Sequence, residues 1–426
     1  MSADRLTRDF ILLRALRWLP VGLVLPFLII TPQARGLSLG EIGIVFAVHS
    51  GVARLVEVPS GALADAFGRR PILVAGAALT ALSLVVFAFA QTVIAFVISV
   101  GLLAAGRALI SGSLEAWFVD SLRLLDPLAP LAHGLSRGTA AEGVAMALGS
   151  LTGGLIVALS GPADGGTGTL SAYGGAALAG ALAAVVYLIA IVILVHERPA
   201  EGAASAAREP VGRRTRQVIV TARAEAARSV TVRIVFVTGV AFGACVTAVE
   251  LLWQPQLATL LDDQETTGFA FGGLAAASML AVALGARLSP NASRRVGLPV
   301  GYLAAIAFTA VCIATLGAPA SALGFASLYL LAYLAFGVAE PMHYELLNDA
   351  VGPGARATLI SAESLATQAG ALVANLGVGA FAAAQGAATA WALAGVVLAL
   401  TAAVVAAPLR VEVAGRQGIP PARRPV

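Results

Sequence analysis

Ten ionisable side chains fall inside long apolar stretches of this sequence, and they are the residues best suited to chemistry. A charged group in a membrane interior is costly, so it usually faces a partner or a water-filled cavity. Carboxylates in such places can carry protons, because burial favours their neutral form. Arginines there can bind anionic groups. The ten residues are His49, Arg54, Glu57, Arg107, Glu115, Glu142, Glu250, Glu340, Glu345 and Glu363.

The stretches that carry these residues must be membrane-spanning helices. The chain is 59% hydrophobic and only 12% charged, whereas a soluble domain has about 25% charged residues. Apolar stretches of about 20 residues recur along the sequence, and each can cross a bilayer core of about 30 Å. Each stretch must be helical, because lipid offers no hydrogen-bond partners to the backbone.

We therefore predict an all-α membrane protein with twelve transmembrane helices. The longest polar segment, 196–232, is rich in Ala, Arg and Glu. It separates an N-terminal six-helix half (1–195) from a C-terminal six-helix half (233–426) and is predicted to be a cytoplasmic linker. The predicted spans are 10–31, 40–63, 71–90, 93–117, 139–160, 171–195, 233–256, 268–288, 298–317, 322–347, 357–383 and 389–408.

The distribution of arginine predicts the orientation of these spans. All 27 basic residues are arginines. With the N-terminus in the cytoplasm and alternating spans, 24 of the 27 lie on the cytoplasmic side, Arg35 lies outside, and Arg54 and Arg107 are intramembrane. This agrees with the positive-inside rule. It predicts a multi-pass protein of the cell (inner or plasma) membrane with both termini in the cytoplasm.

The loop after the second span reads Gly61-Ala-Leu-Ala-Asp65-Ala-Phe-Gly68-Arg69-Arg70. A small residue such as Gly61 allows a neighbouring helix to approach closely, and Gly68 permits a tight turn. The segment resembles motif A of the major facilitator superfamily, although Ala66 stands where that motif has a basic residue. The resemblance extends to the twelve spans and the central linker, and it implies the fold of that superfamily, with two six-helix pseudo-repeats.

The resemblance also implies a conformational gate formed by Gly61, Asp65, Gly68, Arg69 and Arg70. In the family, the corresponding aspartate contacts the start of span eleven, whose helix N-terminus is electropositive. The alternative is that Arg69 and Arg70 only anchor the topology.

A weaker copy of the motif follows span eight. It aligns Gly61 with Gly285, Gly68 with Ala292 and Arg70 with Arg294. Parallel repeats of this kind are expected in such transporters.

Spans one, four, seven and ten line the central cavity in this superfamily. The resemblance therefore assigns Arg107, Glu115, Glu250 and Glu340 to the substrate and proton pathway. The alternative for these four is interhelical ion pairing that only fixes packing.

Four further intramembrane charges, Arg54, Glu57, Glu142 and Glu363, are assigned to gating or to packing ion pairs. Arg54 and Glu57 are three residues apart on one helical face and can pair with each other. Glu142 and Glu363 begin their spans near the cytoplasm, where a carboxylate can interact with the helix dipole. His49 is expected to be a hydrogen-bonded structural group. No role is assigned to the interfacial or loop residues Asp120, His133, His196 and His343.

These observations predict a secondary active transporter that works by alternating access. Proton-coupled efflux of a drug-like or amphipathic compound is favoured, because Glu57-Val-Pro-Ser-Gly61 and the segment 114–120 resemble a bacterial group often assigned to efflux. The antiporter signature of span five is not met, so uptake by symport of a sugar, organic acid or oxyanion is the alternative.

The sequence gives little support to other classes of protein. An enzyme, a channel and an ATP-driven pump are disfavoured, because no P-loop or metal-ligand spacing is found. We expect no cofactor, no metal and no nucleic acid. The expected partners are the lipid bilayer, a small-molecule substrate and protons, and the protein is expected to act as a monomer.

Overall fold

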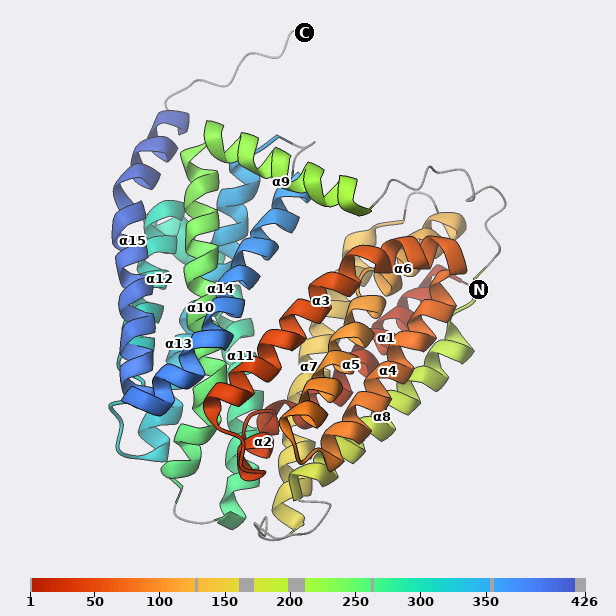
Figure 1. The fold of residues 1–426 in the computed structure, drawn as a ribbon. Coiled ribbons are helices and arrows are strands. Elements are labelled where there is room, and N and C mark those ends of the chain that lie inside the picture. The colour runs from red at the N-terminus through yellow and green to blue at the C-terminus, as the bar shows by residue number, and fades with distance from the viewer. Residues whose placement is uncertain are drawn as a thin grey trace. The chain divides into compact units, whose positions relative to one another are not determined.

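The computed structural model of the 426-residue chain describes residues 2–126, 129–160, 172–197, 211–261, 264–352 and 356–417. Every regular element in these ranges is a helix (Figure 1), which confirms the all-α prediction. Large apolar side chains such as Ile94, Leu182 and Val373 are exposed on the helix surfaces. Extensive exposed apolar surface suits contact with lipid rather than water.

Twelve apolar helical segments follow the order of the predicted spans. Within the described residues, eleven are long and apolar enough to cross a membrane, and the 17-residue helix α12 is a shorter twelfth. The fourth segment contains two helices, α5 and α6. The helices are α1 (Ala3–Val24), η1 (Leu25–Phe27), α2 (Ile30–Ala34), α3 (Leu39–Phe67), α4 (Arg69–Phe89), α5 (Val93–Ile110), α6 (Ser113–Leu125), α7 (Leu131–Leu159), α8 (Ala172–Leu194), α9 (Val211–Arg228), α10 (Val230–Thr259), α11 (Gln264–Val296), α12 (Leu298–Ala314), α13 (Ala322–Ala350), α14 (Arg356–Gln385) and α15 (Ala387–Gln417).

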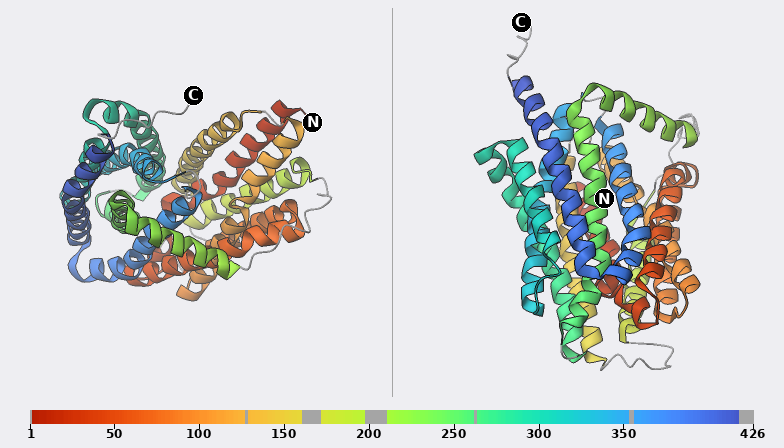
Figure 2. Two further views of the ribbon diagram at one scale, coloured as in Figure 1. Left: turned by 90° about the horizontal axis from the view of Figure 1, so that it is seen from above. Right: turned by 60° about the vertical axis from the view of Figure 1, so that its left-hand side comes forward.

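The helices form two compact units. The first unit contains Met1–Val211 and Leu251–Leu280, and the second contains Gly212–Glu250 and Ala281–Val426. In the first unit, α1 packs against α7 and α8, while α4 packs against α5 and α8. In the second unit, α12 packs against α13 and α15. Figure 2 shows these helices side by side within each unit. The division into 1–195, 196–232 and 233–426 stays a prediction.

A buried apolar core joins α1, α4, α6 and α8 in the first unit. Phe10 of α1 stacks on Phe118 of α6 with ring centroids 4.1 Å apart. Trp117 and Tyr187 are buried in the same core. Burial of such large side chains fixes the faces that these helices turn toward one another.

Two of the predicted spans are interrupted. Helix α1 gives way to η1, at the start of which stands Pro26, a residue that cannot donate a backbone hydrogen bond. Helix α5 ends at Ile110, and Gly112 with φ 77° precedes α6. Arg107 and Glu115, which the sequence places in one span, therefore lie in two helices, α5 and α6, with the interruption at Gly112 between them.

Glycines form the turns before α4 and α12. Gly68 has φ 89° and Gly297 has φ 84°, values that residues with a side chain rarely adopt. Helix α11 continues to Val296 before the chain turns. The predicted alignment of Gly68 with Ala292 is therefore wrong at this turn, since the glycine with the matching conformation is Gly297.

Helices α10 and α14 cross at two glycines in the second unit. A Cβ atom on Gly243 would collide with the carbonyl oxygen of Thr367, and one on Gly370 would collide with that of Val240. Neither obstacle is a flexible side chain. The close approach of these two helices therefore requires glycine at both positions.

We expect Gly243→Ala to destabilise the protein by about 2 kcal/mol, because the added methyl group forces backbone apart in a packed interface. Thermal unfolding in detergent measures this effect. Gly377→Ala in α14 is the matched control, since a Cβ atom there meets open space. Equal melting temperatures for the two variants would show that the crossing is loose.

Candidate functional site

The second unit encloses a cavity of about 280 Å³ between α10, α12, α13 and α14. Phe242 of α10 and Phe336 of α13 line it and stack with ring centroids 4.6 Å apart. Glu340 of α13 and Glu363 of α14 line the same cavity. An apolar, concave site with a few convergent polar groups is typical of small-molecule binding.

A chain of hydrogen bonds runs along one wall of this cavity. His343 Nε2 lies 3.0 Å from Glu363 Oε1, and His343 Nδ1 lies 2.6 Å from Tyr302 Oη. Tyr302 Oη is 2.8 Å from Thr238 Oγ1. Thr367 Oγ1 donates to Glu363 Oε1 over 2.7 Å. We call these five residues the His343 network. It links α10, α12, α13 and α14, and it can hold a proton between an imidazole and a carboxylate.

The two carboxylates at the cavity differ in their surroundings. Glu363 is 3% exposed and is held by His343 and Thr367. Glu340 has an exposed side chain, and no ion pair involves it in the described part of the chain. Glu340 can therefore bind a proton or a ligand cation without first breaking an internal ion pair.

Glu250, the third predicted carboxylate of this unit, does not line this cavity. It accepts a hydrogen bond from the Tyr333 hydroxyl. Tyr333 lines a smaller neighbouring cavity with Phe242 and Phe336. The structure thus brings Glu340 and Glu363 together and leaves Glu250 outside their cavity.

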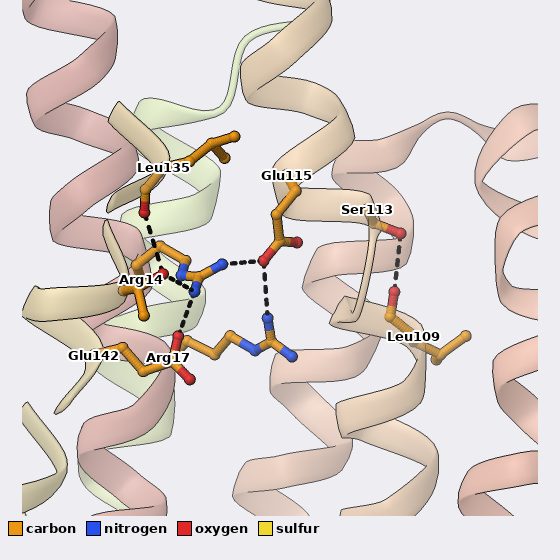
Figure 3. Close-up of polar contacts among 8 residues, drawn as sticks. Arg14, Arg17, Leu109, Ser113, Glu115, Leu135 and Glu142 are labelled. Atoms are coloured by element: carbon orange, nitrogen blue, oxygen red, sulfur yellow. Dashed lines mark hydrogen bonds and ion pairs between the residues drawn. The ribbon is translucent and has the colours of Figure 1, made fainter. Parts of the chain in front are cut away.

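The first unit contains a cluster of ion pairs between α1, α6 and α7 (Figure 3). Arg14 pairs with Glu115 and, at 2.6 Å, with Glu142, while Arg17 lies 3.7 Å from Glu115. The positive-inside distribution counts Arg14 and Arg17 among the cytoplasmic arginines. In the structure they are little-exposed partners of the predicted carboxylates. Their three-residue spacing on α1 is the signal that could have indicated a shared face.

The two predicted intramembrane arginines have different environments. Arg54 pairs with Glu57 at 2.6 Å. Arg107 has no carboxylate partner within the described residues, and its Cζ atom lies 4.8 Å from the ring centroid of Trp18. This distance is within the range of a cation–π contact.

The segment that resembles motif A connects the start of α4 to α6 and to the end of α8. The Arg69 backbone N–H donates to the Glu197 carboxylate, and the Arg69 guanidinium lies 2.6 Å from Asp120. Arg70 donates to the carbonyl oxygen of Val192 over 2.6 Å. Asp120, to which the sequence assigned no role, is thus a partner of the motif.

Of the rest of the predicted gate, Gly68 forms the turn before α4. The backbone at Gly61 and Asp65 belongs to α3, but their side-chain positions are not among the described ones. The contact of Asp65 with the start of span eleven stays a prediction.

A buried glutamine in the first unit compensates for the interruption of the first span. Gln254 Oε1 accepts from the backbone N–H groups of Ile29 and Ile30 over 2.9 and 3.0 Å. Its Nε2 donates to the carbonyl oxygen of Leu25 over 3.2 Å. Backbone groups released by a break in a spanning helix need such partners. A polar residue within the apolar run of span seven was the available signal.

A family model described as Major Facilitator Superfamily matches residues 10–374 of the chain. The chain belongs to the Major Facilitator Superfamily. The match covers most of the chain, including the cavity of the second unit, the His343 network and the ion pairs of Arg14 with Glu115 and Glu142. The protein is therefore a multi-pass membrane transporter of that superfamily, with a small molecule as its substrate.

Solved structures of other transporters share this facilitator's fold. The nucleoside transporter NupG gives a TM-score of 0.75 at 15% identity, with 95% of this chain and 98% of that chain covered. A bacterial homologue of the human lysosomal transporter Spinster, in an inward-facing and occupied conformation, gives a TM-score of 0.74 at 14% identity. The alignment covers 95% of this chain and 96% of that chain. A D-xylose–proton symporter gives a TM-score of 0.69 at 15% identity, with 95% of this chain and 96% of that chain covered. A comparison with curated proteins gave no match.

Sequence reasoning missed four members of the His343 network in this facilitator, namely His343, Tyr302, Thr238 and Thr367. His343 was read as interfacial, yet it lies in α13 beside the cavity with Tyr302 and Thr238 as hydrogen-bonded neighbours. His343 follows Glu340 by three residues, a spacing that places both on one helical face. This spacing could have drawn attention to His343, whereas no local pattern points to Tyr302 or Thr238.

Proposed function

We propose that this facilitator exports a cationic, amphipathic, drug-like molecule in exchange for protons. The observation that carries this proposal is the cavity in which the accessible Glu340 carboxylate lies near the stacked pair Phe242 and Phe336. Acidic and aromatic groups together suit a ligand with a positive charge and an apolar body.

Exchange follows from the chemistry of one carboxylate. The Glu340 carboxylate can hold a proton or the cationic group of a substrate, but the protonated form no longer attracts the cation. Binding of substrate on one side of the membrane therefore releases a proton, and protonation on the other side releases the substrate. The buried pair of His343 and Glu363, at 3.0 Å, supplies a second proton-binding position beside it.

Alternating access requires the six-helix halves, 1–195 and 233–426, to move about the linker 196–232. We assign Gly61, Asp65, Gly68, Arg69 and Arg70 to the gate of this motion. The ion pairs of Arg54 with Glu57 within α3 and of Arg14 with Glu142 between α1 and α7 are candidates for gating or for packing. We place the protein in the cell membrane as a monomer with both termini in the cytoplasm.

Uptake by symport of a sugar, organic acid or oxyanion is the second candidate. The observation that favours it is the polar part of the cavity lining, where Tyr344, Ser364, Thr367 and Gln368 offer hydroxyl and amide groups to a hydrogen-bonding substrate.

Transport into proteoliposomes tests both candidates. With ethidium as the cationic probe, an acidic interior should drive accumulation by exchange. Under symport, an acidic exterior should instead drive uptake of a sugar or organic acid such as xylose or lactate. Ethidium movement that responds neither to the pH gradient nor to the membrane potential would contradict proton coupling.

A further inference from the structure

Helices α1, α4, α5 and α8 of the first unit enclose a second, much smaller cavity of about 10 Å³. We call it the Arg107 cavity. Its polar lining consists of Arg17, Trp18, Thr80, Arg107 and Tyr187. Its volume is about the space that a single water-sized ligand occupies. It belongs to the first unit, whereas the cavity of the proposed function belongs to the second.

Two hydrogen-bond donors in this lining have no acceptor among the residues that the structure describes. Tyr187 is 2% exposed, and its hydroxyl has no hydrogen-bond partner among the described residues. The indole Nε1 of Trp18 is also buried and has no hydrogen-bond partner among the described residues. Buried polar groups in native proteins are nearly always hydrogen-bonded, so each exception requires an explanation. Both donors line the Arg107 cavity, which indicates an acceptor inside it.

The charges around the cavity do not balance. Arg14, Arg17 and Arg107 contribute three positive charges, whereas Glu115 and Glu142 contribute two negative ones and both pair with Arg14. Among the described residues, no carboxylate forms an ion pair with Arg107, and Glu142, which attracts it from farther away, is already paired with Arg14. An arginine cannot lose its charge by deprotonation. Moreover, the Cζ atoms of Arg17 and Arg107 lie 5.6 and 4.8 Å from the same Trp18 ring. An anion would neutralise the surplus charge, and a water molecule would not.

We propose that the Arg107 cavity is a binding site for a monatomic halide, physiologically chloride. Arg107 and Arg17 supply the positive charge, and the Tyr187 hydroxyl and the Trp18 indole N–H donate hydrogen bonds. The small size of the cavity, about 10 Å³, favours a monatomic ion over the larger sulfate, phosphate and carboxylate-bearing solutes. The bound ion joins α1, α5 and α8 beside the interruption at Gly112, and so stabilises this part of the first unit.

The melting temperature of the purified full-length protein tests the site. Sodium chloride should raise it saturably by about 3 °C over sodium gluconate at equal ionic strength, because a ligand that binds only the folded state stabilises it. Sodium bromide should act like chloride, and sulfate like gluconate. In crystals grown with bromide, anomalous scattering should place the ion within contact of Tyr187 Oη and the Arg107 guanidinium. Equal melting temperatures in chloride and gluconate would mean that water fills the cavity and would overturn the proposal.

Variants separate this site from a general salt effect. Arg107→Gln should remove the response to halide. Tyr187→Phe and Trp18→Phe keep most of the ring volume, and each should weaken halide binding roughly tenfold by removing one donor to a charged acceptor. Arg54→Gln is the matched control, because that arginine already pairs with Glu57, and it should respond like the wild type. An unchanged halide response in both aromatic variants would refute the site even if Arg107→Gln does not fold.

Discussion

Replacing Glu340 with glutamine should abolish the pH dependence of substrate binding and weaken binding of a cationic substrate by about tenfold to a hundredfold. A hydrogen bond to a charged group contributes about 1.5–3 kcal/mol, and an amide neither ionises nor neutralises a cation. In the wild type, affinity for a cation should rise with pH as Glu340 loses its proton. In Glu340→Gln, affinity should be low and should not change with pH.

Ethidium binding to the purified protein, titrated between acidic and alkaline pH, measures this effect. Glu345→Gln is the matched control, because Glu345 is an exposed glutamate of the same helix, like Glu340, but does not line the cavity. It should keep both the wild-type affinity and the pH profile. If Glu340→Gln also keeps them, Glu340 is not the group at which cation and proton compete.

Replacing Arg14 with methionine should lower the free energy of unfolding by about 3 kcal/mol. Arg14 is the shared partner of Glu115 and Glu142, and its side chain is mostly buried. Methionine fills a similar space but leaves Glu115 with only the longer contact from Arg17 and removes the ion pair of Glu142. Removing one member of a buried ion pair is costly mainly because the remaining charge is uncompensated.

Thermal or denaturant unfolding of the wild type and of Arg14→Met in the same detergent checks this prediction. Arg5→Met in the same helix is the control, because Arg5 is largely exposed and 4.0 Å from Asp9. Exposed ion pairs contribute little to stability. Adding Glu115→Gln and Glu142→Gln to Arg14→Met should recover part of the lost stability. Similar melting temperatures for Arg14→Met and Arg5→Met would show that the cluster does not hold these helices together.

Much of the architecture follows from the sequence alone. Apolar stretches of sufficient length must form helices in lipid, so composition and length predicted the twelve segments. The segment from Gly61 to Arg70 indicated the superfamily, to which the match over residues 10–374 assigns the chain. The intramembrane carboxylates Glu340 and Glu363 were visible as charges in apolar runs, and both line the cavity of the second unit.

The partners of these charges were decided by the tertiary structure. Arg14 and Glu115 are 101 residues apart in the chain, and Tyr302 and His343 are 41 apart. Hydrophobicity gives the length of a helix in lipid but only weakly its rotation, because every face of a spanning helix is apolar. Which faces meet depends on close contacts such as Gly243 against Thr367, and on breaks such as the one at Gly112. The sequence by itself therefore indicated carboxylates such as Glu340 and Glu363 inside apolar spans. The packing of the helices determined that His343 holds Glu363. It also determined that Arg107 lies over the Trp18 ring and forms no ion pair with a carboxylate in the described part of the chain.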